Sequence, residues 1–297
     1  MLQDGFSRRR FLKCSALLGA QTTLGFGLGR ASGLPMDLAV VTGDSPERNC
    51  TAAVEALGGF SRFVREGDRV TIKPNPIGTS LPEQAIHTHP DMVGAVVKGC
   101  RDAGAESVTV LSYDNRRNMV VNGTAAAVEG AGGVLKALGE REEFREVVIP
   151  RSRILRTEPI AIDVLEADVF INMPIAKHHA GAEVTLTMKN LMGINWDRIR
   201  FHRSGLHQCI AELASAVRHD LVIMDANHVL LSNGPSGPGE VSAARQVIAG
   251  VDPVAVDAFA LRYFQRTPES IDHIRIAHQL GVGEIDLGKL RIREYTA

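Results

Sequence analysis

Short apolar runs of strand type alternate with amphipathic helical patterns along most of the chain. The runs at residues 70–72, 108–111, 169–171 and 221–224 are rich in β-branched residues and too short for a helix. Between them, segments such as residues 90–104 place apolar side chains three or four positions apart, with proline near the start and glycine at the end. This alternation predicts an α/β protein with a parallel or mostly parallel sheet and helices on both of its faces.

Less regular segments set further expectations for the fold. Ser45 and Pro46 are expected to begin a helix, because serine caps helices and proline fits the first helical position. Residues 124–138 are predicted as a helix weakened by three glycines, and residues 290–292 as the last strand. No repeat or linker interrupts residues 33–297, which are therefore expected to form one domain.

The beginning of the chain has the pattern of an export signal. Residues 7–13, S-R-R-R-F-L-K, match the twin-arginine motif, and a mildly apolar, glycine-rich stretch follows. That stretch is too short for a stable membrane span, which needs about 20 strongly apolar residues. We expect residues 1–32 to be a signal peptide and the twin-arginine (Tat) translocase to be a partner during export. Residues 33–297 would then be periplasmic or secreted, without a stable membrane span. A basic arm or an uncleaved anchor is the alternative.

Charge and cysteine content argue against two classes of function. The chain has 33 basic and 34 acidic side chains; residues 1–31 hold five of the basic and one of the acidic groups, so their removal leaves 28 against 33. A nucleic-acid partner is not expected, because such proteins favour a basic surface. Beyond the signal only Cys50, Cys100 and Cys209 remain, without C-x-x-C spacing. No disulfide framework and no iron–sulfur cluster from this chain's own cysteines is therefore expected.

Polar side chains follow several predicted strands at the point where each strand ends. Ligands of open α/β sheets bind outside the carboxyl ends of the strands. If these strands are parallel neighbours, their ends converge on one crevice. The four clusters are Lys73-Pro74-Asn75, residues 172–179, residues 225–228 and Gly250-Val251-Asp252.

Lysines dominate the chemistry of this predicted crevice. Lys73, Lys177 and Lys189 are suited to a phosphate or a carboxylate, because an ammonium group donates up to three hydrogen bonds. Structural interpretations remain open for single residues. A lysine at position 73 is also typical of a solvated strand end. Asn75, between two prolines, is also typical of a turn. Asp252 fits a helix cap.

Histidines and aspartates add acid–base and metal-binding chemistry. His89, His178 and His179 are candidates for either role. Adjacent side chains of an extended segment point to opposite sides, so at most one of His178 and His179 is expected to enter the site. Asp225 follows a strand, and Asp257 lies one turn into a predicted helix, where its side chain can face the mouth of the crevice.

The chain resembles the DUF362 family, whose shared domain has no characterised function. The stretches that carry the resemblance occur in the family's order and are V-T-I-K-P-N (70–75), T-H-P-D-M-V (88–93), I-N-M-P-I-A-K-H-H (171–179), L-T-M-K-N-L-M-G (186–193), D-L-V-I-M-D-A (220–226), N-G-P-S-G-P-G (233–239) and V-I-A-G-V-D-P-V-A-V-D-A (247–258). The resemblance implies a pocket made of Lys73, Asn75, His89, Lys177, Lys189, Asn190 and Asp257. Some relatives carry an appended iron–sulfur module, for which this chain lacks the cysteines. The pair His178-His179 departs from the family's single histidine after a threonine or similar residue.

Three functions fit these residues, and the sequence leaves the reaction, the substrate and any cofactor open. The first is binding of, or action on, a small anionic ligand. The second is metal binding or metal-dependent hydrolysis through histidine and aspartate, although the lysines would repel a metal ion and no metal ligand set is assigned. The third is a non-catalytic partner of an exported redox complex. For the first function, the catalytic candidates are Lys73, His89, Lys177 and His178, and the ligand-binding candidates are Asn75, His179, Lys189, Asn190, Asp225 and Asp257.

Overall fold

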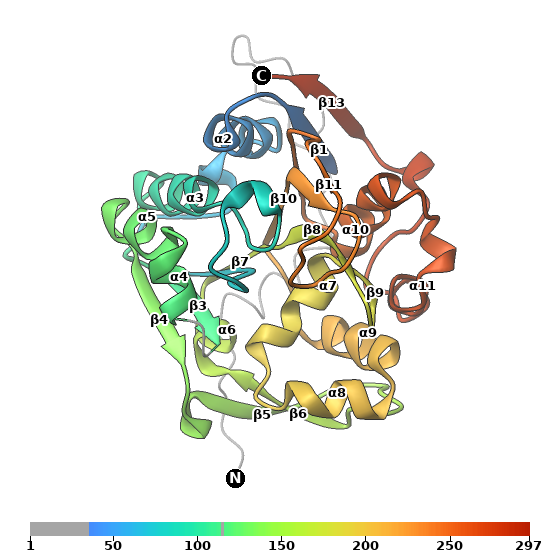
Figure 1. Cartoon of the computed structure of the whole chain (residues 1–297). Coiled ribbons are helices and arrows are strands. Elements are labelled where there is room, and N and C mark those ends of the chain that lie inside the picture. The colour runs from blue at the N-terminus through green and yellow to red at the C-terminus, as the bar shows by residue number, and fades with distance from the viewer. Residues whose placement is uncertain (1–35, 114–115) are drawn as a thin grey trace, which may run out of the picture.

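The structure, a computed structural model, describes residues 36–113 and 116–297 (Figure 1). The predicted signal peptide, residues 1–32, lies outside the described residues. Within them the main sheet has eleven strands, eight of which follow one another in the order β13-β1-β12-β10-β7-β2-β3-β4. Their bounds are β1 Leu38–Thr42, β2 Arg69–Pro74, β3 Ser107–Tyr113, β4 Val134–Leu138, β7 Val169–Met173, β10 Leu221–Leu230, β12 Gln246–Gly250 and β13 Ile292–Thr296.

Most neighbouring strands of this sheet are parallel. Strands β4, β3, β2, β7 and β10 run in one direction, and β13 is parallel to β1. Only β12 among the eight opposes its neighbours, since it pairs antiparallel with both β10 and β1. The prediction of a mostly parallel sheet in a single α/β domain is confirmed.

The direction of β12 corrects one expectation about the crevice. Because β12 is antiparallel to β10, its carboxyl end lies at the opposite edge of the sheet from the other strand ends. Asp252 therefore lies at the opposite edge of the sheet from the other three clusters. Its Oδ1 accepts hydrogen bonds from the N–H groups of Val254 and Ala255, at 2.8 and 3.0 Å, and so caps α10 (Pro253–Ala260).

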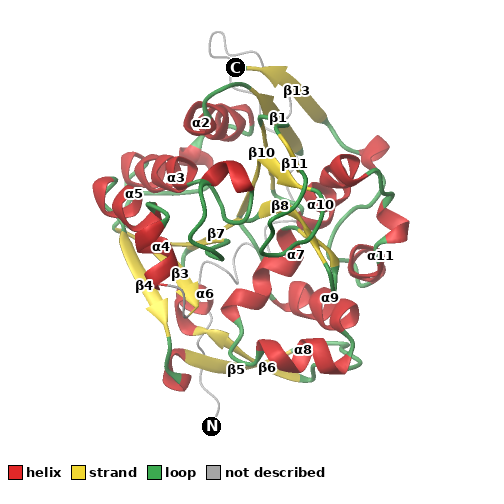
Figure 2. Ribbon diagram, in the orientation of Figure 1, coloured by secondary structure: helices red, strands yellow, loops and turns green. Residues whose placement is uncertain are grey.

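Helices cover both faces of the sheet, as the alternation of elements predicts (Figure 2). Successive residues of β1 divide between the two cores: Val40 belongs to one apolar cluster and Val41 to the other. The face that carries Val41 is covered by α2 (Pro46–Ala56), α3 (Pro90–Asp102) and α5 (Thr124–Gly130). The face that carries Val40 is covered by α9 (Leu206–Ala216), α10 and α11 (Asp272–Gln279).

Three predicted elements differ from the structure. The strand expected over residues 221–224 continues as β10 to Leu230, so residues 225–228 lie within a strand and not after its end. The helix expected over residues 124–138 ends at Gly130, and residues 134–138 form β4 instead. Gly132 has a φ of 80°, a left-handed conformation that stops the helix and turns the chain into the sheet. The last strand is longer and later than expected, since β13 runs from Ile292 to Thr296.

The segment after β7 builds the edge of the sheet where the site lies. Pro174 separates β7 from β8 (Ile175–His179), which pairs in parallel with the long strand β10 and antiparallel with β9 (Glu183–Thr185). The short helix α7 (Thr187–Asn190) follows directly, and α8 (Arg198–Ser204) comes next. The residues between the predicted strand 169–171 and Asn190 are thus fixed by two short strands and a helix.

The remaining elements complete the fold. Strands β5 (Phe144–Val148) and β6 (Thr157–Ala161) form a separate antiparallel pair, the short helices α4 (Arg116–Val121) and α6 (Ile162–Glu166) flank the sheet, and β11 (Val241–Ser242) pairs with β10. No helix in the described part of the chain is both long enough and apolar enough to cross a membrane.

Candidate functional site

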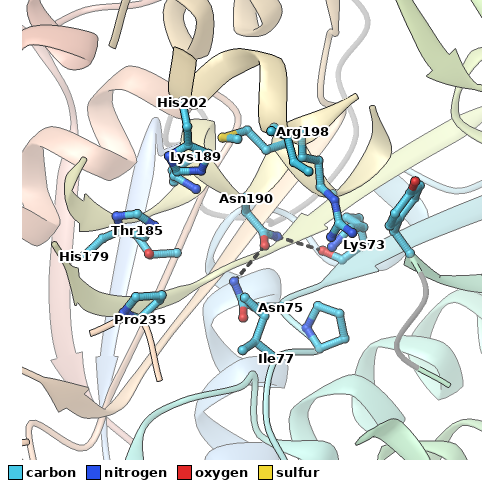
Figure 3. A pocket seen from close by; sticks show the side chains of 15 residues that line it. Lys73, Asn75, Ile77, His179, Thr185, Lys189, Asn190, Arg198, His202 and Pro235 are labelled. Carbon is cyan, nitrogen blue, oxygen red and sulfur yellow. Dashed lines mark hydrogen bonds between the residues drawn. The ribbon is translucent and has the colours of Figure 1, made fainter. Parts of the chain in front are cut away.

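A cavity of about 360 Å³ opens at the carboxyl ends of β2 and β8, beside α7 and α8 (Figure 3). One part of its wall is apolar and includes Ile77, Tyr113, Met192 and Pro235. The other part is basic or amidic. Its polar members come from segments far apart in the sequence and are Lys73, Asn75, His179, Thr185, Lys189, Asn190, Arg198 and His202.

A continuous row of hydrogen bonds runs from the cavity wall into the core. Nζ of Lys177 donates to Oδ1 of Asn75 at 3.2 Å, and Nδ2 of Asn75 donates to Oδ1 of Asn190 at 3.1 Å. Nδ2 of Asn190 donates to Oδ1 of Asn172 at 2.8 Å, and Nδ2 of Asn172 approaches Nε2 of His219 at 3.1 Å. All five side chains are buried. The row links three strand ends and helix α7 through side chains alone.

Two backbone carbonyls fix the direction of this row. Nδ2 of Asn190 also donates to the carbonyl of Lys73 at 3.2 Å, and Nδ2 of Asn172 to the carbonyl of Thr187 at 2.9 Å. A carbonyl oxygen only accepts hydrogen bonds, so Nδ2 of Asn190 must face the carbonyl of Lys73, and Nδ2 of Asn172 must face that of Thr187. Asn75 must then present its nitrogen to Asn190 and its oxygen to Lys177. The second N–H of Asn75 has no acceptor among the described residues and is available to a ligand.

The lysines of the site lack acidic partners. Lys73 and Lys177 are buried, and Lys189 is partly exposed beside them. No carboxylate in residues 36–113 or 116–297 forms an ion pair with any of their amines. Burial, with repulsion from Arg198, lowers the pKa of Lys73 to about 7 and that of Lys189 to about 8. Burial and then repulsion from Lys189 and Lys73 lower the pKa of Lys177 to about 7.

Repulsion among the three ammonium groups destabilises the protein unless something offsets it. Two unit charges 6 Å apart repel by about 3 kcal/mol at an effective dielectric constant of 20. Lys177 has two acceptors, Oδ1 of Asn75 and the carbonyl of Ile86, which stabilise its ammonium form. Lys73 has one, the carbonyl of Pro74 at 2.5 Å, and Nζ of Lys189 has none among the described residues. Lys73 and Lys189, which line the cavity, therefore have fewer hydrogen-bond acceptors than Lys177.

His179 is a neutral hydrogen-bond donor at the edge of the cavity. Its Nδ1 accepts from the N–H groups of Gly181 and Ala182, each at 3.0 Å, so the ring proton must be on Nε2. Burial, with repulsion from Lys189, lowers the pKa of His179 to about 3. His178 points to the other side of β8: its Nδ1 accepts from the N–H of Gly234 at 3.0 Å. It lines a neighbouring cavity of about 390 Å³, which His179 also borders.

Five of the ten candidate residues do not line this cavity: Lys177, His178, His89, Asp225 and Asp257. The last three hold its segments in place. Oδ2 of Asp225 accepts from the N–H of His89 at 2.8 Å, and Nδ1 of His89 caps α3. The oxygens of Asp257 accept from the N–H groups of Thr187 and Met188, at 2.7 and 3.1 Å. Asp257 thereby fixes the start of the helix that carries Lys189 and Asn190. Its burial raises its pKa to about 7.

Arg198 and His202, which are not among the residues predicted from sequence, line the same cavity from α8. The guanidinium of Arg198 lies 3.9 Å from the centre of the Tyr113 ring, and the His202 ring stacks on that of His179 with centroids 6.1 Å apart. The basic run R-I-R-F-H-R at residues 198–203 carries the signal that could have identified them. Positions four apart on a helix share a face, and these two residues are four apart.

The histidines and acids do not gather into a metal centre in the part of the chain that the structure describes. No group of three or more His, Cys, Asp or Glu side chains there is placed to hold a metal ion. Cys50, Cys100 and Cys209 are buried free thiols. The polar chemistry of the site is therefore that of ammonium, guanidinium, imidazole and amide groups.

Fold and cavity together define an α/β protein with a basic cavity at the carboxyl edge of a mostly parallel sheet. The family model described as "Domain of unknown function (DUF362)" matches residues 70–262, so the chain belongs to this family. All polar side chains of the cavity wall fall inside the matched range. The resemblance noted in the sequence is confirmed at the level of the family.

Two known proteins are similar to this chain over most of its length. The thylakoid-associated protein sll1697 of Synechocystis sp. is 27% identical over 250 residues, which cover 77% of this chain and 73% of that protein. The lactate racemase apoprotein of Thermoanaerobacterium thermosaccharolyticum superimposes with a TM-score of 0.51 at 14% identity over 81% of this chain. The match spans only 59% of the racemase chain. At this identity the likeness shows a shared fold alone.

Proposed function

We propose that this protein binds a small anionic ligand, bearing a phosphate or a carboxylate, in the cavity between β2, β8, α7 and α8. The observation that carries the proposal is the set of basic side chains on the cavity wall, Lys73, Lys189 and Arg198, whose two lysines pair with no described carboxylate. A bound anion would supply the missing negative charge. It would also accept the unused N–H of Asn75.

The pKa values of the site support the same ligand class. Four basic side chains of the cavity have lowered pKa values: about 7 for Lys73, about 8 for Lys189 and about 3 for His179, and the pKa of His202 is shifted in the same direction. Burial is the first cause of each, and repulsion from another basic group adds to it. An anion reverses both effects, because it favours the protonated form of every neighbouring base.

Calorimetric titration with inorganic phosphate tests the proposal. Wild-type protein should bind one phosphate per chain. The Lys189→Met variant should bind at least about tenfold more weakly, because a hydrogen bond to a charged group contributes about 1.5–3 kcal/mol. Lys98→Met is the matched control, since Lys98 lies on the exposed face of α3, paired with Asp102 at 2.7 Å. Equal affinity of both variants and wild type, or no phosphate binding at all, would refute the proposal.

The cellular location of the protein is part of the same proposal. Residues 7–13 carry the twin-arginine pattern, so we infer that the chain is exported by the Tat translocase and acts in the periplasm or outside the cell. That route usually handles proteins that fold before export.

A further inference from the structure

The side chain of Lys73 occupies space that only a glycine at position 193 leaves open. A Cβ atom at Gly193 would lie 2.7 Å from Cε and 2.9 Å from Nζ of Lys73. The backbone of Gly193 does not need a glycine for its own sake, because its φ is not in the left-handed region. Glycine at position 193 therefore leaves room for the amine of Lys73. Both Lys73 and Gly193 line the cavity.

Lys73 differs from the other two lysines in how its amine is held. Lys177 donates to Oδ1 of Asn75 and to the carbonyl of Ile86, and it does not line the cavity. Lys189 is partly exposed, which lets water stabilise its charge. Lys73 is 1% exposed, with one hydrogen bond, to the carbonyl of its own neighbour Pro74. Its surroundings favour the neutral amine, and its pKa of about 7 agrees.

We propose that Lys73 is a nucleophile that forms an imine with a small 2-oxo carboxylate bound in this cavity. The proposal rests on the anion-binding function and names a class of ligand for it. The carboxylate of such a ligand would pair with Lys189 and Arg198, which line the same cavity. Its carbonyl carbon would face the amine of Lys73. A cavity of about 360 Å³ suits a ligand of this small size.

The step needs no oxidant, reductant or further reactant. The lone pair of neutral Nζ forms a bond to the carbonyl carbon while the C=O π pair moves to oxygen. That oxygen takes up a proton, and the nitrogen loses one, to give a carbinolamine. Loss of the hydroxyl group with a further proton, as water, leaves the C=N bond. His179 carries its proton on Nε2 and is available to donate a hydrogen bond to the carbonyl oxygen at the cavity edge.

Reductive trapping tests the inference on the full folded protein. Wild-type protein is incubated with pyruvate or glyoxylate and sodium cyanoborohydride at pH 7, and the adduct is located by peptide mass spectrometry. Lys73 should be labelled at least about tenfold faster than any exposed lysine, because about half of its amines are neutral at pH 7 and fewer than about one in a thousand of theirs are. Excess phosphate should slow labelling of Lys73 and leave exposed lysines unaffected.

Two glycine variants test whether labelling depends on the position of the Lys73 amine or only on the general reactivity of lysines. Gly193→Ala should reduce labelling of Lys73 at least about tenfold relative to wild type, whereas Gly130→Ala, whose Cβ would meet nothing within 4 Å, should not. Labelling spread evenly over exposed lysines, or an unlabelled Lys73 in protein that binds phosphate, would overturn the imine and leave anion binding intact. Absence of both phosphate binding and Lys73 labelling would overturn the two together.

Discussion

Asn75 and Asn190, which are 115 positions apart in the chain, share a hydrogen bond of 3.1 Å from Nδ2 of the first to Oδ1 of the second. This bond joins the end of β2 to helix α7 across the floor of the basic cavity (Figure 3). It is one link of a row whose direction is set by backbone carbonyls. Because every amide in the row has a fixed orientation, a single oxygen in place of a nitrogen should disturb the whole site.

Asn190→Asp is expected to be strongly destabilising. Nδ2 of Asn190 donates to the carbonyl of Lys73 and to Oδ1 of Asn172, and a carboxylate oxygen at that place would face two acceptors without a proton between them. Burial of unsatisfied acceptors costs about 1–3 kcal/mol each. Urea denaturation at pH 7 should therefore show a loss of about 2 kcal/mol or more. Unchanged stability would contradict the assigned orientation of the amides.

Anion affinity should fall as the pH rises through the range in which the cavity lysines titrate. Sulfate is the appropriate probe, because its own charge is constant between pH 6 and 9. A bound anion favours the ammonium forms of Lys73 and Lys189, whose pKa values in the free protein are about 7 and 8. Sulfate binding should therefore take up protons and weaken about tenfold or more from pH 6 to pH 9. Constant affinity over this range would show that these lysines do not bind the anion.

The same shifts have the opposite effect on the stability of the free protein. Each lysine has a lower pKa in the folded state than its ordinary value of 10.5, so the unfolded chain binds more protons between the two values. The contribution of Lys73 and Lys177 to the free energy of unfolding should then increase from about pH 7 to about pH 10. Sulfate should reduce this slope by raising the folded pKa values.

His219 should be neutral, with its proton on Nδ1. Nδ2 of Asn172 faces Nε2 of this ring at 3.1 Å and must donate to it, because the same nitrogen also donates to the carbonyl of Thr187. Burial lowers the pKa of His219 to about 4, so this ring destabilises the fold increasingly as the pH falls from 6.5 to 4. Nitrogen-15 NMR at pH 6 should show the Nδ1–H tautomer.

Two substitutions at this position give a matched comparison. His219→Gln keeps an acceptor within reach of Asn172, whereas His219→Leu leaves one buried N–H without a partner. We expect the leucine variant to be less stable than the glutamine variant by about 1–3 kcal/mol. A protonated imidazole at pH 6, or equal stability of the two variants, would contradict the direction of the amide row.

Export should depend on the arginine pair near the start of the chain. Replacement of Arg8 and Arg9 by lysine keeps the charge and removes the twin-arginine motif. The double variant should accumulate as folded protein in the cytoplasm, while wild type reaches the periplasm. Fractionation followed by immunoblotting measures this directly, and normal periplasmic accumulation of the double variant would refute the export proposal.

The sequence predicts the alternation of elements and the polar clusters at the ends of β2 and β7, because short apolar runs and terminal polar clusters are local patterns. It does not predict the direction of β12, since residues 247–249 are apolar whichever way the strand runs. For the same reason the sequence places both Asp252 and Asn75 at converging strand ends. The difference arises only from pairing with β10, a contact between distant segments.

Pairwise contacts also change the roles of individual residues. The sequence predicts Lys177 as a catalytic candidate in the crevice, but in the structure its amine does not line the cavity and donates to Oδ1 of Asn75 and to the carbonyl of Ile86. Its loss would leave both acceptors unsatisfied. Arg198 and His202 are not predicted as site residues, because a basic run on a helix is also typical of a solvated surface.

The most direct test of the basic cavity is a crystal structure of the protein grown with sodium selenate and measured at the selenium absorption edge. The anomalous signal locates the anion without assumptions about affinity. We expect a selenate in the cavity, within hydrogen-bond distance of Nζ of Lys73 or Lys189 and close to the free amide N–H of Asn75. Selenate found only at exposed arginines and lysines, with the cavity filled by water, would contradict the proposed function.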